Sequence, residues 1–206
     1  MLPVRSKYKI AKRLGAGVFE QTQTQKFALS EARTAATKKK PRGRGGSDYG
    51  RQLLEKQRVR YTYGLNERQL SNYAEKAMKE ADPSTSLHKM LEMRADSVVY
   101  RAGLAGTRRM ARQLVSHGHI MVNGRRTTTP SHHLKKGDVL TIREGSRQSP
   151  LFAGLAEKSA EGGTRAIPQW VNVDVSLLKA EVAGEPVYTT VETGLDYATV
   201  FEFYSR

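Results

Sequence analysis

Apolar positions in the first half of the chain recur at the spacing of short helices. A first helix is expected from Ser47 to Gly64, since a glycine after the last turn adopts a positive φ at little cost. A second begins at Asn66, which has the capping-box partner Gln69, and its apolar positions stop before Pro83. A third is expected after the Ser-Thr-Ser run that follows this proline. The pattern predicts a small helical bundle.

Residues 92–152 follow a mixed pattern. A short amphipathic helix precedes a second helix, which Thr107 caps and which runs to about residue 117. Asn123 and Gly124 then follow a short apolar run, and both tolerate the positive φ of a tight hairpin turn. Another strand is expected over residues 139–142. The segment therefore predicts two helices followed by a small antiparallel sheet.

The two ends of the chain differ from its middle in composition and in the pattern of apolar positions. Residues 1–46 combine basic clusters with Ala-, Thr- and Gln-rich sequence that offers little to bury, which predicts a basic extension with poor order of its own. Residues 168–175, around the only tryptophan, alternate like a strand. Residues 199–204 are apolar enough to pack against a core. We expect packing roles for both of these later segments.

The charge is large and unevenly distributed. The chain has 206 residues and a net charge of +15. Residues 1–70 carry net +12 and residues 71–150 net +7, whereas residues 151–206 carry net −4. Because a charge that served only solubility would not need this asymmetry, the first three quarters are expected to meet a polyanion.

Composition excludes several classes of protein. Without cysteine, the chain has no disulfide scaffold, thiolate zinc site, iron–sulfur cluster or Cys nucleophile. No run of 18 apolar residues predicts a membrane span, and the N-terminal sequence has no apolar stretch typical of a secretory signal. The 38% of hydrophobic residues is lean but sufficient for a core.

The best candidate for a binding surface lies in residues 92–152. Arg108, Arg112 and Ser116 follow one another at intervals of four and line up along one helix edge. The turns that follow are basic as well, at Arg125 and at the Lys-Lys pair 135–136. Planar guanidinium groups suit bidentate contacts with phosphate. The alternative is a solvated helix face.

Other readings of single residues remain open. His117 and His119, or the adjacent histidines 132 and 133, invite a metal site, but the spacing is unspecific without cysteine or paired carboxylates. Asp96 invites comparison with a catalytic aspartate of RNA-modifying enzymes, although an acid in the first turn of a helix is favoured by the helix dipole anyway. A stand-alone RNA-binding factor is a further alternative.

Several motifs resemble, in order, those of the ribosomal S-four family. They are Ser47–Leu53, Glu55–Arg58, Arg94–Arg101, Ala111–Ile120 and the closing Phe201–Arg206. The resemblance covers most of the chain and implies a bacterial-type or organellar member. Some family members bind zinc through N-terminal cysteines, which this chain lacks.

The resemblance implies an α+β fold and a function. In the family an RNA-binding module, here residues 92–152, is inserted into a helical domain, so residues 47–91 and residues 153–206 would form one body behind the basic N-terminal extension of residues 1–46. Members bind a junction in the 5′ domain of small-subunit ribosomal RNA early in assembly. They lie near the messenger-RNA entrance, beside the S-five protein. The implied protein is cytoplasmic, non-enzymatic and free of cofactor and metal, and has no membrane partner.

Charge pattern and resemblance together predict a set of RNA contacts. The set contains basic residues, uncharged polar residues, histidines and one tyrosine. Its members are Lys9, Lys12, Arg13, Arg42, Arg44, Ser47, Tyr49, Arg51, Lys56, Arg58, Arg60, Arg68, Arg101, Thr107, Arg108, Arg109, Arg112, Gln113, Ser116, His117, His119, Asn123, Arg125, Lys135 and Lys136.

Overall fold

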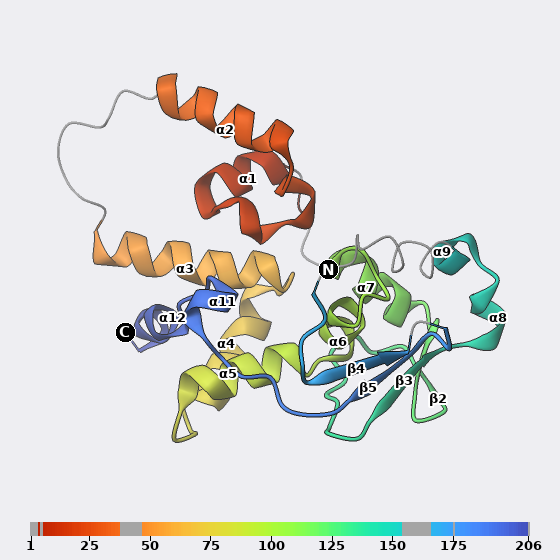
Figure 1. The fold of residues 1–206 in the computed structure, drawn as a ribbon. Coiled ribbons are helices and arrows are strands. Elements are labelled where there is room, and N and C mark those ends of the chain that lie inside the picture. Colours follow the sequence, from red (N-terminus) through yellow and green to blue (C-terminus); the bar gives the residue numbers. More distant parts are fainter. Residues whose placement is uncertain (1–3, 5, 38–46, 154–165, 175, 206) are drawn as a thin grey trace. The chain divides into compact units, whose positions relative to one another are not determined.

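The chain folds into two compact units. A computed structural model describes residues 4, 6–37, 47–153, 166–174 and 176–205 (Figure 1). The first unit holds the described residues up to Leu87 together with those from Tyr188 onward, and the second holds those from His88 to Val187. The fold is α+β, as expected: the first unit is helical and the second contains an antiparallel sheet.

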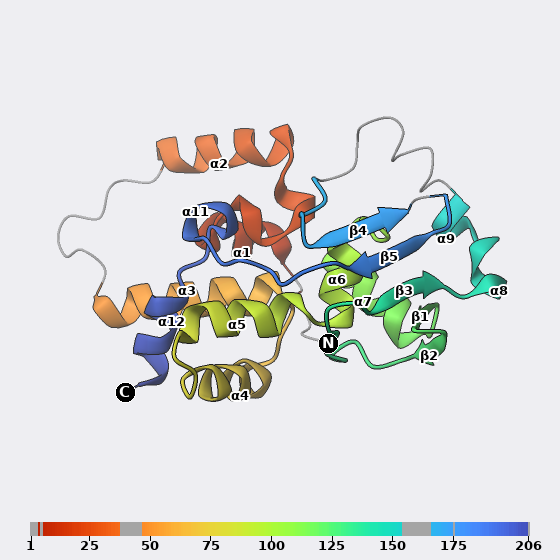
Figure 2. The same ribbon diagram turned by 60° about the horizontal axis from the view of Figure 1, so that its bottom comes forward.

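Two helices from distant parts of the sequence pack together in the first unit. Helix α3 (Asp48–Thr62) begins as expected after Ser47, whose hydroxyl accepts a hydrogen bond from the Gly50 N–H at 3.2 Å. Helix α12 (Tyr197–Tyr204), from the end of the chain, lies beside it (Figures 1 and 2). The expected packing role of the last apolar segment is confirmed.

The next helix has the predicted start, but its successor does not. Helix α4 (Glu67–Ala77) has a complete capping box, because Gln69 N–H donates to Asn66 Oδ1 at 2.8 Å and Asn66 N–H donates to Gln69 Oε1 at 3.2 Å. The prediction of a helix that begins after residue 86 is wrong: α5 (Pro83–Glu92) begins at the proline itself. Proline has no N–H to lose in the first turn and its φ already suits a helix.

The expectation of a poorly ordered N-terminal extension is wrong for the described residues 6–37. They form α1, η1, η2 and α2, which span Lys7–Leu14, Ala16–Val18, Glu20–Thr22 and Gln25–Thr37. Five buried residues make a small core, against which Leu54 and Tyr61 of α3 pack: Ala11, Leu14, Val18, Phe19 and Phe27. The sequence pattern did not indicate this core, because its apolar residues are few and lie within Ala- and Gln-rich sequence. Residues 38–46, with the predicted contacts Arg42 and Arg44, lie outside the described residues.

The second unit opens with the expected helices and hairpin. Helices α6 (Ala95–Arg101) and α7 (Arg108–Ser116) precede strands β1 (Ile120–Val122) and β2 (Arg125–Thr127). The two residues between these strands have φ values of 48° and 75°, which confirms the left-handed Asn-Gly turn. Strand β3 (Val139–Ile142) also forms where it is predicted.

Two later strands complete this sheet. Strands β4 (Val171–Asp174) and β5 (Lys179–Val182) give a five-stranded antiparallel sheet in the order β2-β1-β3-β5-β4. The structure therefore differs from the expected boundary after residue 152, since residues 171–182 join the sheet and only those from 188 onward belong to the helical unit. The reason is that β3 offers an open edge, and the alternating buried residues of β5 fill the same core.

Helices α6 and α7 pack against one face of this sheet (Figures 1 and 2). Short helices complete the molecule: α8 (Glu144–Arg147), α9 (Pro150–Ala153) and, in the first unit, α11 (Thr190–Thr193). In the described part of the chain, none of the helices has both the length and the apolar character needed to cross a bilayer.

Candidate nucleic-acid interface

Helix α7 presents a buried side and an exposed side. Thr107 begins it by accepting a hydrogen bond from the Met110 N–H at 3.1 Å, and Ala111, Leu114 and Val115 face the core. The exposed side chains are those of Arg109, Gln113, Ser116 and, at the end of the helix, His117.

Two other arginines of α7, which the sequence places on its binding edge, are largely enclosed. Arg108 donates to Glu92 Oε1 at 2.9 Å and its guanidinium lies 4.5 Å from the centre of the Tyr100 ring. Arg112 donates to Asp96 Oδ2 at 2.8 Å. Their side chains are only 13% and 12% exposed. The expected alignment along one edge exists, but this edge turns toward acidic partners inside the second unit.

Two buried carboxylates organise four arginines here. Glu92, which is 1% exposed, also accepts two bonds from Arg101, at 2.7 and 2.9 Å. Asp96, which is 5% exposed, accepts two bonds of 2.9 Å from Arg94. We call Glu92, Asp96, Arg94, Arg101, Arg108 and Arg112 the ion-pair cluster. Its four cations and two anions leave net positive charge beside the exposed side of α7.

The hairpin and the following turn are held together by one aspartate. Asp138 accepts bonds from the Asn123 amide at 2.8 Å and from the Lys135 N–H at 2.7 Å. Partial burial alone would raise the pKa of Asp138, but these bonds outweigh it and lower the pKa. Asn123 also accepts from the Val139 N–H at 2.9 Å. The structure thus gives the predicted contact Asn123 a role in the turn, and it presents Arg125, Lys135 and Lys136 as exposed side chains.

One exposed arginine of the hairpin is missing from the predicted contacts. Arg126 donates to the His117 carbonyl at 3.1 Å and so lies across the end of α7. It fits there because Gly118 has no side chain: a Cβ at this position would clash with the Arg126 guanidinium, and the φ of +71° also favours glycine. We call the exposed cations and polar groups of this unit the module surface: Arg109, Gln113, Ser116, His117, Arg125, Arg126, Lys135 and Lys136.

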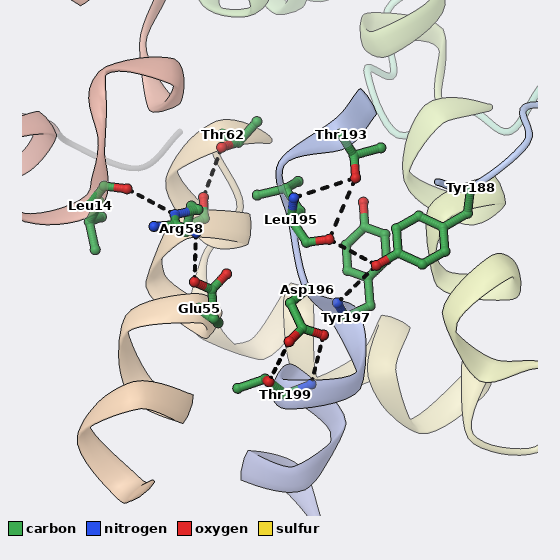
Figure 3. A network of polar contacts seen from close by, with 10 residues as sticks. All are labelled: Leu14, Glu55, Arg58, Thr62, Tyr188, Thr193, Leu195, Asp196, Tyr197 and Thr199. Carbon is green, nitrogen blue, oxygen red and sulfur yellow. Dashed lines mark hydrogen bonds and ion pairs between the residues drawn. The ribbon is translucent and has the colours of Figure 1, made fainter. Parts of the chain in front are cut away.

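Three predicted contacts on α3 are held by bonds inside the first unit. Lys56 is buried, donates to Glu67 at 2.7 Å and lies 4.0 Å from the centre of the Phe203 ring. Arg58 donates to the Leu14 carbonyl at 2.8 Å and to Glu55 at 2.6 Å (Figure 3). Arg60 bonds Gln57 at 3.2 Å and lies 3.7 Å from Glu67. These residues join α3 to α4, to α12 and to the N-terminal core.

The end of the chain is fixed by polar contacts of its own. Asp196 caps α12 by accepting from the Thr199 N–H at 3.2 Å and the Thr199 hydroxyl at 2.6 Å (Figure 3). Tyr188 donates to the Leu195 carbonyl at 2.8 Å. Together with the Tyr63–Tyr197 hydroxyl pair, 3.3 Å apart, these bonds anchor the C-terminal segment in the helical unit.

The remaining predicted contacts of the first unit lie near the surface. Tyr49 is 49% exposed, and Lys9, Arg13, Arg51 and Arg68 are exposed as well. Two further residues are engaged within the unit: Lys12 of α1 donates to Thr34 of α2 at 2.8 Å, and Ser47 caps α3.

His119, which is among the predicted RNA contacts, is half-buried and makes a contact within the second unit. His119 Nδ1 lies 2.9 Å from the Ser146 hydroxyl. Within the residues that the structure describes, histidines and carboxylates form no group of three placed to hold a metal ion.

A buried histidine makes the stability of the second unit dependent on pH. Burial lowers the pKa of His88 below its usual 6.5; Glu92 opposes this, and Arg101 and Arg108 add to it. Below pH 6.5 the unfolded state therefore binds more protons, so stability that is present above this pH is lost as the pH falls. We expect the free energy of unfolding, followed by Trp170 fluorescence, to decrease from pH 7 to 5.

The His88→Gln variant is expected to lose most of this pH dependence. Part of it remains, because desolvation also lowers the pKa of His133. The exposed His132→Gln variant controls for removal of a histidine as such. Equal pH slopes in wild type and His88→Gln would contradict the assignment.

Comparison with known proteins defines the class. The family model described as "S4 domain" matches residues 93–140, and "Ribosomal protein S4/S9 N-terminal domain" matches residues 4–93. The chain is thus an S4-domain protein with a ribosomal-type N-terminal domain, which includes the helices before residue 38. The small ribosomal subunit protein uS4 of Roseiflexus castenholzii is 41% identical over 207 residues, covering 96% of each chain.

A second relative gives the same result. The small ribosomal subunit protein uS4 of Borrelia turicatae is 36% identical over 202 residues, covering 98% of this chain and 96% of its own. The chain belongs to the uS4 family, which confirms the resemblance seen in its motifs.

Proposed function

We propose that this chain is a structural constituent of the small ribosomal subunit that binds small-subunit ribosomal RNA. The module surface carries the proposal, because its cations come from α7, the hairpin and the following turn, which hydrogen bonds hold in fixed relation. Preorganised cations bind phosphate with less loss of conformational freedom than a flexible basic tail. Membership in the uS4 family and the net charge of +15 support it.

The more detailed proposal concerns the place of binding. We propose a primary role at a junction of the 5′ domain, where binding nucleates assembly of the body of the subunit in the cytoplasm. The S-five protein and messenger RNA near its entrance are the proposed neighbours. The acidic C-terminal quarter, residues 151–206 with net −4, supports a protein neighbour rather than RNA on that part of the chain.

The mechanism is binding without turnover. Arginine and lysine neutralise phosphates and release counterions, so affinity falls as salt rises. The deep, narrow major groove of A-form RNA hides base edges, and the folded RNA is therefore read by the shape of its backbone. Asp96, the residue that invites comparison with a catalytic aspartate, bonds two arginines, which supports a structural role.

The test compares affinity and its salt dependence. Wild type is expected to bind a 5′-domain RNA fragment far more tightly than heparin. The double variant Arg109→Gln/Lys136→Gln is expected to lose about 10-fold or more in affinity, and its salt slope should fall by about 0.7–0.9 for each phosphate contact removed.

The exposed Lys79, outside the module surface, provides the control. Lys79→Gln removes one charge and should keep the wild-type affinity and slope. A double variant that binds as wild type does would remove the module surface from the interface. Equal binding of heparin and RNA by wild type would leave only charge attraction.

A further inference from the structure

An aromatic ring stands exposed on a cationic helix of the first unit. Helix α1 has the sequence KYKIAKRL, with four cations and no acid. Its Tyr8 is 45% exposed although it packs on Phe27, which is 1% exposed. The two ring centres are 5.5 Å apart and tilted by 52°. The buried ring therefore supports Tyr8 from below, while much of Tyr8 meets solvent.

Two cations of α1 lie on the outer side of the helix, next to the flank that carries this ring. Ala11 and Leu14 are buried and define the inner side. At 100° per residue, Lys9 and Arg13 fall on the side away from them, and Tyr8 lies on the flank of the helix, at the border between the two sides. Both cations are exposed. An aromatic face bordered by cations matches single-stranded nucleic acid, whose bases stack while its phosphates are neutralised.

We propose that Tyr8 is a stacking platform for one unpaired nucleobase of ribosomal RNA, with the neighbouring phosphates on Lys9 and Arg13. The inference rests on the proposed function and adds to it a second contact outside the module surface. Charge complementarity identifies the ligand of this platform as nucleic acid: the cations of α1 attract the phosphates, and a planar base covers the Tyr8 ring. If the only role of Tyr8 were to cover Phe27, an aliphatic side chain of similar size would be sufficient at this position.

The experiment separates stacking from charge and from packing. Tyr8→Leu is measured against the 5′-domain RNA fragment, oligoadenylate and a blunt RNA duplex of equal length. Affinity for the first two is expected to fall about 10-fold, because the variant loses a contact with a base. The slope of log affinity against log salt concentration should stay unchanged, because no phosphate contact is lost. Affinity for the duplex should stay within about twofold, since its bases are already stacked. Tyr8→Phe keeps the ring and should bind as wild type does.

A matched control lies on α2. Leu29 is 62% exposed and stands between Lys26 and Arg33 at helical spacing, but it has no aromatic face. Leu29→Ala should leave all three affinities unchanged. Should Tyr8→Leu unfold α1, a Tyr8→Trp variant in a Trp170→Phe background decides: its fluorescence should be quenched by oligoadenylate and not by the duplex.

Two results would overturn the platform: Tyr8→Leu binding as wild type does, or losing as much affinity for the duplex as for oligoadenylate. Unquenched Tyr8→Trp fluorescence in saturating oligoadenylate would do the same. If wild type itself does not prefer the ribosomal fragment over heparin, the proposed function fails instead, which is a different observation.

Discussion

The Glu92→Gln variant is expected to lose about 3–5 kcal/mol of the free energy of unfolding of the second unit. Glu92 is 1% exposed and bonds Arg101 and Arg108, whose side chains are 28% and 13% exposed. The amide keeps the shape of the carboxylate but removes its charge. Two poorly hydrated guanidinium groups then lose their counter-charge, and this penalty exceeds the gain from burying a neutral side chain.

Denaturation in urea, followed by fluorescence, measures this loss. Trp170 is the only tryptophan of the chain and packs against the core of the second unit, so its signal reports on that unit. The matched control is Glu185→Gln. Glu185 bonds Lys89 at 2.6 Å, but the two side chains are 60% and 41% exposed, so a loss below about 1 kcal/mol is expected. If Glu92→Gln and Glu185→Gln lost similar amounts of the free energy of unfolding, burial would not determine how much the ion-pair cluster stabilises the unit.

The ion-pair cluster also decides which arginines are suitable for testing RNA binding. Replacing Arg108 or Arg112 by Glu would place a second carboxylate against Glu92 or Asp96. Such a variant is expected to unfold the unit, so lost binding would not locate the interface. Arg109 is exposed on the same helix and tests binding without this complication.

Local signals made much of the fold predictable. A capping box at Asn66 and the turn at Asn123 and Gly124 each depend on residues a few positions apart, and the structure has both. The family could be predicted for a similar reason, because its motifs are contiguous. By contrast, the pairing of β5 with β3 joins residues some 40 positions apart, and no local pattern encodes it.

In the candidate site, too, local features were predictable from the sequence and contacts between distant residues were not. The periodicity of α7 places Arg108 and Arg112 on one edge, yet it cannot show that Glu92 and Asp96, each 16 residues earlier, lie against that edge. The sequence could have indicated Arg126 as a contact, since it follows Arg125 in the second strand of a hairpin with a two-residue turn. Its contact with the end of α7 depends on the space that Gly118 leaves free, which only the fold reveals.

The Phe27→Ala variant is expected to open the N-terminal helices. Phe27 is the largest fully buried side chain in the core that α1, η1 and α2 share. Truncating a buried phenylalanine costs about 3–5 kcal/mol, from lost transfer energy and the cavity left behind. A core of five buried residues has few neighbours that can fill this cavity. Hydrogen exchange of the amides in α1 and α2 should accelerate accordingly, by a factor of roughly 10²–10³.

Leu29→Ala on the same helix is the control: Leu29 is 62% exposed, so a change within about 0.5 kcal/mol is expected. Deleting residues 1–46 extends the test to α3. The deletion uncovers Leu54 and Tyr61 and removes the Leu14 carbonyl to which Arg58 donates. Because α3 loses this cover, its amides should also exchange faster. Unchanged exchange in α3 would mean that the N-terminal helices are an addition to the helical unit, whereas faster exchange makes them part of its core.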